Sequence, residues 1–223
     1  MSRQTAVITD RLSMTTRSEV SPTAGLLLAG GASTRMGGRD KAQCDIAGRS
    51  LMMRVVERLE PQCVSLVLNS NEEPAHFSEM TLPLVADQLP GRQGPLAGLL
   101  AGFDWIKANC AGIEWVLSAS IDCPFLPRDL VSRLHEARRA ADASIVAARS
   151  GQRTHHVIAL WRLSLRGDLR AALDQGFRQV GAFGQRHRTT FVEWPCEPFD
   201  PFFNINTPED LAEAQRLAEI IGA

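Results

Sequence analysis

The chain has 223 residues, of which 44% are hydrophobic and 22% charged, and its formal net charge is −1. This length suits one α/β domain with a full hydrophobic core, and the composition is typical of a globular protein. The balanced charge indicates no general affinity for nucleic acid or an anionic membrane, and the sequence lacks the run of about 18 apolar residues that a membrane span needs.

The amino-terminal residues 1–21 mix Arg, Thr and Ser and lack the apolar core of a secretory signal. We therefore predict a disordered extension over 1–21 and a single domain over 22–223, with an organelle transit peptide as the alternative for the extension. The five scattered cysteines form no C-x-x-C pair, which argues against a disulfide framework and for a reducing, cytoplasmic location.

Apolar periodicity and turn residues divide the rest of the chain into alternating strands and helices. In chain order we expect a strand at 23–30, a helix at 51–60, strands at 64–69 and 82–87, a helix at 95–109, a strand at 114–122, a helix at 127–140, strands at 143–148, 155–161 and 189–194, and a final helix from 208. This alternation predicts a mostly parallel sheet with helices on both faces, although it does not reveal the strand order.

Two helices carry clear start signals. Pro95 suits the first turn of the helix at 95–109, whose apolar face is formed by Leu96, Leu99, Leu100, Phe103 and Ile106. In "NTPEDL", Thr207 can cap the last helix, Pro208 fills its first position, and Asp210 can complete a capping box.

The stretch "LLLAGGASTRMGGRDKAQCDIAGRSL" (26–51) contains a loop with four glycines and two cationic side chains, between two apolar segments. Glycines let backbone N–H groups approach a bulky anion, and Arg35 and Lys41 can bind its oxygens, so the loop suits a polyphosphate. A flexible surface loop is the alternative. The loop contains neither a Walker A motif nor the dinucleotide fingerprint G-x-G-x-x-G.

The polar signals collect where predicted strands end, at the glycine loop, Asn69, Asp87 and Asp122. Ligands of open α/β sheets bind beyond the carboxyl ends of the strands, so this coincidence predicts the functional site. A carboxylate such as Asp122 at the end of an apolar strand can hold Mg²⁺ against substrate phosphates, or it can simply cap the following turn.

The loop resembles the nucleotidyltransferase signature L-A-[AG]-G-x-[SG]-x-R-[ML]-G followed by a lysine. "LAGGASTRMGGRDKA" is similar to the first motif of the molybdenum cofactor guanylyltransferase (MobA) family. Further similar pieces follow in the family's order: "VLNSN", an Asp before "GPLAGLLAG", "SIDCPFLP", "FRQVGAF" and "FFNINTPEDL". One departure is "THHVIALW", where His156 replaces the proline that is usual in the family.

The resemblance implies a Rossmann-like three-layer nucleotidyltransferase fold, of the type found in nucleotide-diphospho-sugar transferases. It also implies a reaction, in which GMP passes from GTP to molybdenum-bound molybdopterin. The products are molybdopterin guanine dinucleotide and pyrophosphate, and Mg²⁺ is the expected cofactor. Transient contacts with cofactor-biosynthesis proteins and with apo-molybdoenzymes or their chaperones are further expectations.

The resemblance also assigns roles to individual residues. Arg35, Lys41 and Asp122 are the expected catalytic residues, and Asp122 is the expected metal ligand. The expected GTP-binding residues are Leu28, Ala29, Gly30, Lys41, Asn69, Asp87 and Asp122, and whether Asp87 meets base or ribose stays open.

Other residues carry weaker assignments. Asn204 and Asn206 are candidates for the pterin or metal site, with turn hydrogen bonding as the alternative, and Arg178 is a candidate anchor for the pterin phosphate. His155 and His156 are neighbours on a strand and therefore face opposite sides, which disfavours a joint metal site.

Three alternatives stay open. A cytidylyltransferase acting on the same pterin is the nearest, and Gly30 favours GTP because the missing methyl leaves room for a purine. A sugar-nucleotide pyrophosphorylase fits less well with the short chain. A non-catalytic adaptor that binds nucleotide or cofactor is the alternative outside enzymes, and it has no need of a metal-binding carboxylate.

Overall fold

A seven-stranded sheet organises the computed structural model, which describes residues 21–30, 44–77, 80–89 and 94–221. The strand order is β5-β4-β1-β6-β8-β7-β9. The strands are β1 (Thr23–Leu28), β4 (Ser65–Asn69), β5 (Leu84–Val85), β6 (Trp115–Ser120), β7 (Ile145–Ser150), β8 (Arg153–Arg162) and β9 (Thr189–Trp194). Arg35 and Lys41 lie outside the described residues.

Strand direction agrees with the predicted, mostly parallel sheet. β1 pairs in parallel with both β4 and β6, β4 pairs in parallel with β5, and β7 pairs in parallel with β9. β8 is the exception, because it runs antiparallel to its neighbours β6 and β7. The carboxyl ends of six strands therefore share one edge of the sheet, where β8 contributes its amino end.

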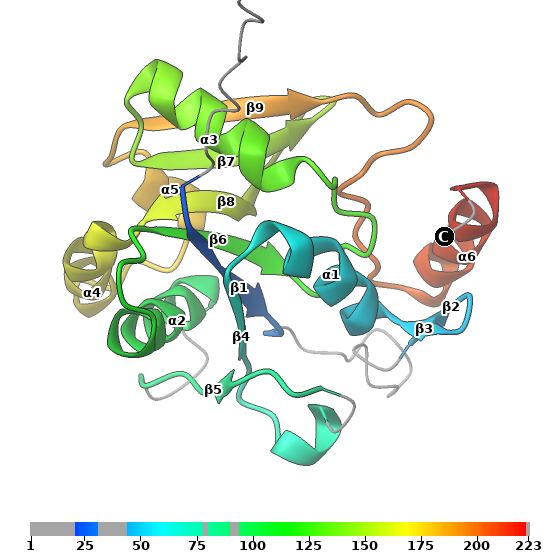
Figure 1. Ribbon diagram of the computed structural model, residues 1–223, viewed down its shortest axis with the longest axis horizontal. Coiled ribbons are helices and arrows are strands. Elements are labelled where there is room, and N and C mark those ends of the chain that lie inside the picture. Colours follow the sequence, from blue (N-terminus) through cyan, green and yellow to red (C-terminus); the bar gives the residue numbers. More distant parts are fainter. Residues whose placement is uncertain (1–20, 31–43, 78–79, 90–93, 222–223) are drawn as a thin grey trace, which may run out of the picture.

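Helices cover both faces of this sheet (Figure 1). The helices are α1 (Leu51–Leu59), α2 (Pro95–Asn109), α3 (Leu130–Ala141), α4 (Arg166–Asp174), α5 (Val180–Gly184) and α6 (Pro208–Ile221), of which α6 lies beside the sheet rather than on a face. α1 and α3 pack on one face and α2, α4 and α5 on the other, which gives three layers. The predicted three-layer α/β fold is confirmed.

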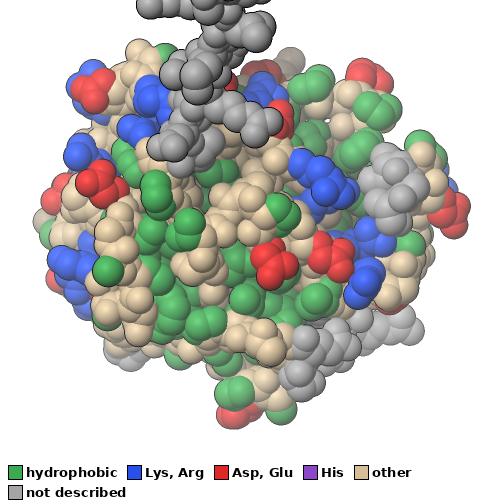
Figure 2. Space-filling view, viewed as in Figure 1, with side chains coloured by type: hydrophobic (Ala, Val, Ile, Leu, Met, Phe, Trp, Pro, Cys, Tyr) green, Lys and Arg blue, Asp and Glu red, His purple; other side chains and the backbone are tan. Residues whose placement is uncertain are grey.

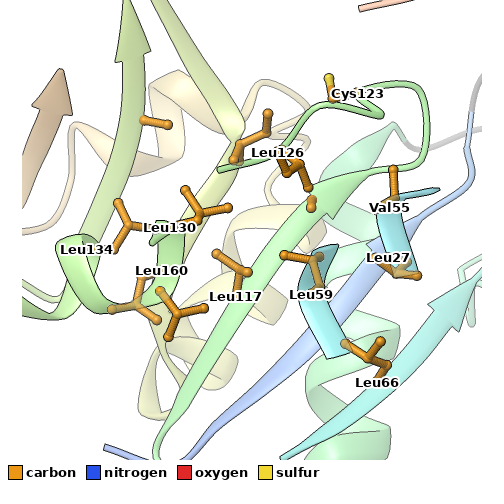
Figure 3. Close-up of a cluster of buried hydrophobic side chains, with 14 of the residues drawn as sticks. Leu27, Val55, Leu59, Leu66, Leu117, Cys123, Leu126, Leu130, Leu134 and Leu160 are labelled. Carbon is orange, nitrogen blue, oxygen red and sulfur yellow. The ribbon is translucent and has the colours of Figure 1, made fainter. Parts of the chain in front are cut away.

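The sequence of β1 is a nearly continuous apolar run because the strand is covered on both faces of the sheet. Leu27 packs in the cluster beneath α1 and α3, which Figure 3 shows, whereas Leu26 and Leu28 pack in the cluster beneath α2 and α4. Successive side chains point to opposite faces, and both faces are covered, so every position favours an apolar residue. Leu26 and Leu27 are fully buried.

α2 approaches the sheet closely because it carries glycines on its inner side. A Cβ at Gly102 would lie 2.4 Å from both methyl groups of Leu26, and a Cβ at Gly98 would lie 2.2 Å from Oδ1 of Asn69. The five apolar residues predicted for the inner face of this helix are all at most 1% exposed.

A small third cluster joins α6 to a hairpin that the sequence did not reveal. β2 (Asp45–Ile46) and β3 (Arg49–Ser50) pair antiparallel, and the turn between them places Ala47 and Gly48 at positive φ. Ile46 packs there with Phe125 and with Ala214 of α6.

The predicted capping box of α6 is confirmed. The Asp210 backbone N–H donates to Thr207 Oγ1 at 3.1 Å, and the Thr207 backbone N–H donates to Asp210 Oδ2 at 2.9 Å. This exchange satisfies two backbone donors at the start of the helix.

A buried histidine ties α3 to the start of β1. Arg138 Nε donates to His135 Nδ1 at 3.0 Å, so Nε2 carries the proton and donates to Thr23 Oγ1 at 2.7 Å. Thr23 in turn donates to the carbonyl of Ser21. Burial is the main cause that lowers the pKa of His135 from 6.5 to about 4.

Acidic and basic side chains occur together on the face shown in Figure 2, where Lys and Arg side chains on the right lie near acidic ones at the centre.

Among the residues that the structure describes, no helix combines the length and apolar character needed to cross a bilayer.

Candidate active site

Four neighbouring strands end in register at the carboxyl edge of the sheet. Leu28 of β1 pairs with Asn69 of β4 on one side and with Ser120 of β6 on the other, and Asn69 pairs with Val85 of β5. We call these four residues the terminal row. Adjacent strands lie about 4.8 Å apart, so the terminal row spans about 14 Å from β5 to β6.

The two predicted carboxylates lie just past opposite ends of the terminal row. Asp87 follows Val85 by two residues, and Asp122 follows Ser120 by two residues. The β6 strand therefore ends two residues before the sequence suggested, and Asp122 lies in the turn that follows. Ala29 and Gly30 continue β1 between the two acids, and the Ala29 backbone N–H donates to the Asn69 carbonyl at 2.9 Å.

Asp87 is held by two asparagines. Asn69 Nδ2 donates to Asp87 Oδ1 at 2.9 Å, and Asn71 Nδ2 donates to Asp87 Oδ2 at 2.9 Å. The Asp87 backbone N–H donates back to Asn71 Oδ1 at 2.8 Å. Each carboxylate oxygen has a further lone pair, so Asp87 keeps the capacity to accept hydrogen bonds from a ligand in a fixed orientation.

The Asn69 side chain serves this arrangement from a buried position. Its second amide proton goes to the Val85 carbonyl at 3.0 Å, and its Oδ1 abuts Gly98 of α2. Asn69 is 5% exposed and both of its amide protons bond within the protein, so its side chain orients the Asp87 carboxylate. Sequence reasoning missed Asn71 and Gly98, although Asn71 lies in the quoted "VLNSN".

Asp122 is anchored through its backbone by the carboxyl-terminal segment. The Ile205 N–H donates to the Asp122 carbonyl at 3.0 Å, and the Ile121 N–H donates to the Leu28 carbonyl at 3.3 Å. Cys123 is buried, and its thiol lies 3.6 Å from Asp122 Oδ1 and 3.7 Å from the Phe202 carbonyl. These contacts join β1, the Asp122 turn and the segment before α6, which brings Asn204 next to this turn.

Asn204 offers an oxygen that no described residue binds. Its Oδ1 is buried and has no hydrogen-bond partner in the described part of the chain. Buried polar atoms are normally paired, and carboxylate and amide oxygens are the ligands that Mg²⁺ prefers. The described residues hold no cluster of three or more His, Cys, Asp or Glu suited to a metal. The donors present therefore fit an ion held by one or two protein oxygens together with substrate phosphates.

Gly30 leaves space that the described protein does not fill. No described atom lies within 4 Å of a Cβ built at this position, and Gly30 is exposed. Packing against the described residues therefore does not require a glycine here.

Arg178 and Asn206 lie near this edge and partly serve local structure. Arg178 Nη1 donates to the carbonyl of Leu173, in the last turn of α4, and to that of Phe177, beyond the end of α4. The Arg178 carbonyl lies 3.5 Å from a Cβ built on Gly94 at the start of α2. The Asn206 backbone N–H donates to Asp210 Oδ2 at 2.8 Å.

His155 and His156 lie on opposite faces of β8, as predicted. His155 Nε2 bonds Ser150 Oγ at 2.7 Å, and its ring packs 4.8 Å from the ring of Phe202. His156 instead lies against Gly181 of α5. The pairing of β8 with β7 shifts register beside His156. The proline that the MobA family usually has at this position would therefore fall where the strand pairing is irregular.

Comparison with known proteins identifies the family. The MobA-like NTP transferase domain family matches residues 25–189, which include every residue of the terminal row and both acids. The chain belongs to this family. A MobA-like relative from Rhodopseudomonas palustris (strain BisB5), named molybdenum cofactor guanylyltransferase, is 55% identical over 197 residues, covering 88% of this chain and 94% of the relative. One of the same name from Nitrobacter hamburgensis is 50% identical over 205 residues, covering 92% and 98%.

Solved structures show the same fold at lower identity. Molybdopterin-guanine dinucleotide biosynthesis protein A from Archaeoglobus fulgidus superposes with a TM-score of 0.69 at 23% identity, covering 88% of this chain and 99% of that one. The 2-C-methyl-D-erythritol 4-phosphate cytidylyltransferase from Thermus thermophilus gives 0.60 at 17% identity, covering 87% and 98%. These matches confirm the MobA-like nucleotidyltransferase fold predicted from the sequence.

Proposed function

We propose that this protein transfers GMP from GTP to molybdenum-bound molybdopterin, forming molybdopterin guanine dinucleotide and releasing pyrophosphate. The observation that carries this proposal is the terminal row, which aligns Asp87 and Asp122 at opposite ends of one edge in a chain of the MobA-like family. Relatives that are 50–55% identical over most of their length bear the name molybdenum cofactor guanylyltransferase, which supports the choice of substrate.

The length of the terminal row suits an extended nucleoside triphosphate. We place the guanosine at the β5 end, where Asp87 is oriented by Asn69 and Asn71. Guanine N1–H and N2–H₂ and the ribose hydroxyls are donors, which a carboxylate accepts. The triphosphate then passes the backbone of Leu28, Ala29 and Gly30 toward Asp122 at the β6 end.

The proposed reaction is an in-line displacement at phosphorus. An oxygen of the terminal phosphate of molybdopterin forms a bond to the α-phosphorus of GTP. The bond from that phosphorus to the bridging oxygen of the β-phosphate breaks, and pyrophosphate leaves with the electron pair. Such transfers depend on positioning and charge neutralisation. We assign the neutralising cations to Arg35 and Lys41, on their motif positions.

Asp122 and Asn204 are the residues that we propose for holding Mg²⁺. The carboxylate and the unpartnered Oδ1 of Asn204 are hard oxygen donors on two segments joined by the Ile205–Asp122 hydrogen bond. When bound, Mg²⁺ supplies charge neutralisation on the phosphates. The backbone contacts around Asp122 fix its carboxylate near the end of β6 before any ligand arrives.

The acceptor side is assigned to the segment before α6 and to Arg178, which lies between α4 and α5. Asn204, Asn206 and Arg178 are the residues that we propose to meet the pterin or its phosphate, since all three lie near the carboxyl edge. We further propose a cytoplasmic location and transient contacts with cofactor-biosynthesis proteins and with apo-molybdoenzymes or their chaperones.

Gly30 distinguishes the proposed use of GTP from the cytidylyltransferase alternative, which would use CTP. No described atom fills the space beside this residue, so a purine bound at the β5 end can extend toward it, and an added methyl would reduce that space. If GTP is the substrate for this reason, Gly30→Ala should lower the preference for GTP over CTP without unfolding the protein.

One assay tests the proposal against its alternatives. Purified protein is incubated with molybdenum-bound molybdopterin, Mg²⁺ and either GTP, CTP or ATP, and pyrophosphate and the dinucleotide are both measured. We expect pyrophosphate from GTP only when the acceptor is present. Preferred use of CTP would indicate the cytidylyltransferase, and nucleotide binding without pyrophosphate release would indicate the adaptor.

A further inference from the structure

A hollow of about 490 Å³ lies between α5 and the face of the sheet formed by β7, β8 and β9. It exists because α5 is short of side chains. Gly181 and Gly184 are three residues apart, so they share one face of this helix, and both line the hollow. A Cβ at Gly184 would make an ordinary 3.7 Å contact with Thr189 Oγ1, so neither backbone strain nor overlap with the described residues requires that glycine.

Apolar side chains form the floor of the hollow, and Arg and His side chains line its side. Ile145, Ala147, Trp161, Val180 and Phe191 supply apolar and aromatic surface. Arg149, His156 and His187 also line it, together with Thr154, Gln185 and Thr189, and no Asp or Glu belongs to the lining.

His187 is the unusual member of this lining. Its Nε2 is buried and has no hydrogen-bond partner among the described residues, while its ring packs 4.6 Å from the ring of Phe183. Burial lowers the pKa of His187, so the ring is neutral at pH 7. Leaving such a nitrogen unpaired is unfavourable, and a hydrogen bond to a ligand would remove that cost.

Arg149 is already held in place at the wall. Its guanidinium lies 3.9 Å over the Phe191 ring, and its Nε donates to Thr154 Oγ1 at 3.0 Å. These contacts use one of five N–H donors, so the rest of the guanidinium is available in a fixed orientation. A preorganised cation beside an aromatic floor is complementary to a flat molecule that carries negative charge.

We propose that this hollow binds a small planar organic anion, whose acidic group meets His187 at one end and whose ring lies on the floor near Trp161, toward Phe191 and Arg149 at the other end. The hollow shares no residue with the terminal row or with Asp87 and Asp122, so it is a second site. This binding is independent of whether the chain transfers GMP.

Phenyl phosphate is the probe, with inorganic phosphate and phenol as its two halves. Binding is followed by the ¹⁹F signal of Trp161 in fluorotryptophan-labelled protein and by the imidazole signals of His187. We expect both signals to shift saturably with phenyl phosphate and to respond about tenfold more weakly to either half. Shifts that never saturate, or that do not involve Trp161, overturn the proposal.

Two variants locate the binding. Gly184→Val fills the hollow and should weaken phenyl phosphate binding at least tenfold, whereas Gly167→Val, at an open position in α4, should leave it unchanged. His187→Phe keeps the ring but removes the nitrogen, so it should weaken binding while the melting temperature stays the same or rises. Unchanged affinity in both Gly184→Val and His187→Phe refutes the proposed site.

GTP and molybdopterin are themselves planar organic anions, so each is added to the phenyl phosphate complex in turn. Loss of the Trp161 shift identifies that substrate as the natural occupant, and persistence identifies a third molecule. Either result supports the hollow as an anion site, and neither depends on catalysis.

Discussion

Gly98→Ala is predicted to impair GTP binding although residue 98 reaches a ligand only through other residues. The added methyl would lie 2.2 Å from Asn69 Oδ1 and 3.0 Å from Leu28 Cδ2, so the Asn69 carboxamide must move. That movement breaks the bonds from Asn69 Nδ2 to the Val85 carbonyl and to Asp87 Oδ1. The orientation of the Asp87 carboxylate is then lost.

The expected free-energy changes follow from these contacts. Overpacking costs about 1–3 kcal/mol and each lost hydrogen bond about 1 kcal/mol, while alanine gains about 1 kcal/mol over glycine in a helix. We expect the free energy of unfolding to fall by about 2–4 kcal/mol. Losing an oriented charged hydrogen bond costs about 1.5–3 kcal/mol, which weakens GTP binding roughly 10- to 100-fold.

Two other glycine-to-alanine changes are matched controls. In Gly102→Ala the methyl would lie 2.4 Å from Leu26 in the core, so the protein should lose up to about 2 kcal/mol of stability but bind GTP within about twofold of wild type. In Gly167→Ala the methyl meets open space, so the protein should gain up to about 1 kcal/mol. Urea unfolding and calorimetric GTP titration are measured on all three. Equal GTP affinity in Gly98→Ala and Gly102→Ala would refute the reasoning.

Three further predictions concern a buried histidine far from the site, a partner of Asp87 and the cap of α6. Because the pKa of His135 is about 4 when folded and 6.5 when unfolded, the unfolded chain binds more protons between these values, so stability falls as pH drops from 6.5 toward 4. By pH 5 the loss reaches about 2 kcal/mol, and urea midpoints at pH 7.5 and 5 should differ less in His135→Gln. Asn71→Ala should raise the KM for GTP about tenfold with little change in kcat, because it removes the hydrogen bond to one oxygen of Asp87. An unchanged KM would contradict the role of Asn71 in orienting Asp87. Thr207→Ala should lower the free energy of unfolding by about 1 kcal/mol through the lost cap of α6, and thermal melting checks this.

Most of the fold could be predicted because its signals are local. β1 lies in a continuous apolar run since both sheet faces are covered, and α6 begins where Thr207 and Asp210 exchange hydrogen bonds. The β2–β3 hairpin was not predicted, because each of its strands has only two residues and Ala47 is not a typical residue for a turn with positive φ. The five-residue α5 was missed for a similar reason.

The sequence predicted which polar residues lie at the carboxyl edge of the sheet, but not the contacts among them. Strand ends pointed to Asn69, Asp87 and Asp122, since polar side chains after apolar runs lie at the sheet edge. The strand order sets the separation of the two acids, and no local pattern encodes that order. The same holds for Asn71 and Gly98, whose roles depend on contacts with residues 16 and 29 positions away along the chain.

The most direct test of the account is a crystal structure of the protein with GTP and Mg²⁺. We expect the guanosine beside Asp87, the triphosphate along Leu28 to Gly30, and the metal about 2.1 Å from an Asp122 oxygen. Guanosine bound at the β6 end, or a metal that does not contact Asp122, would contradict the proposed assignment of the site.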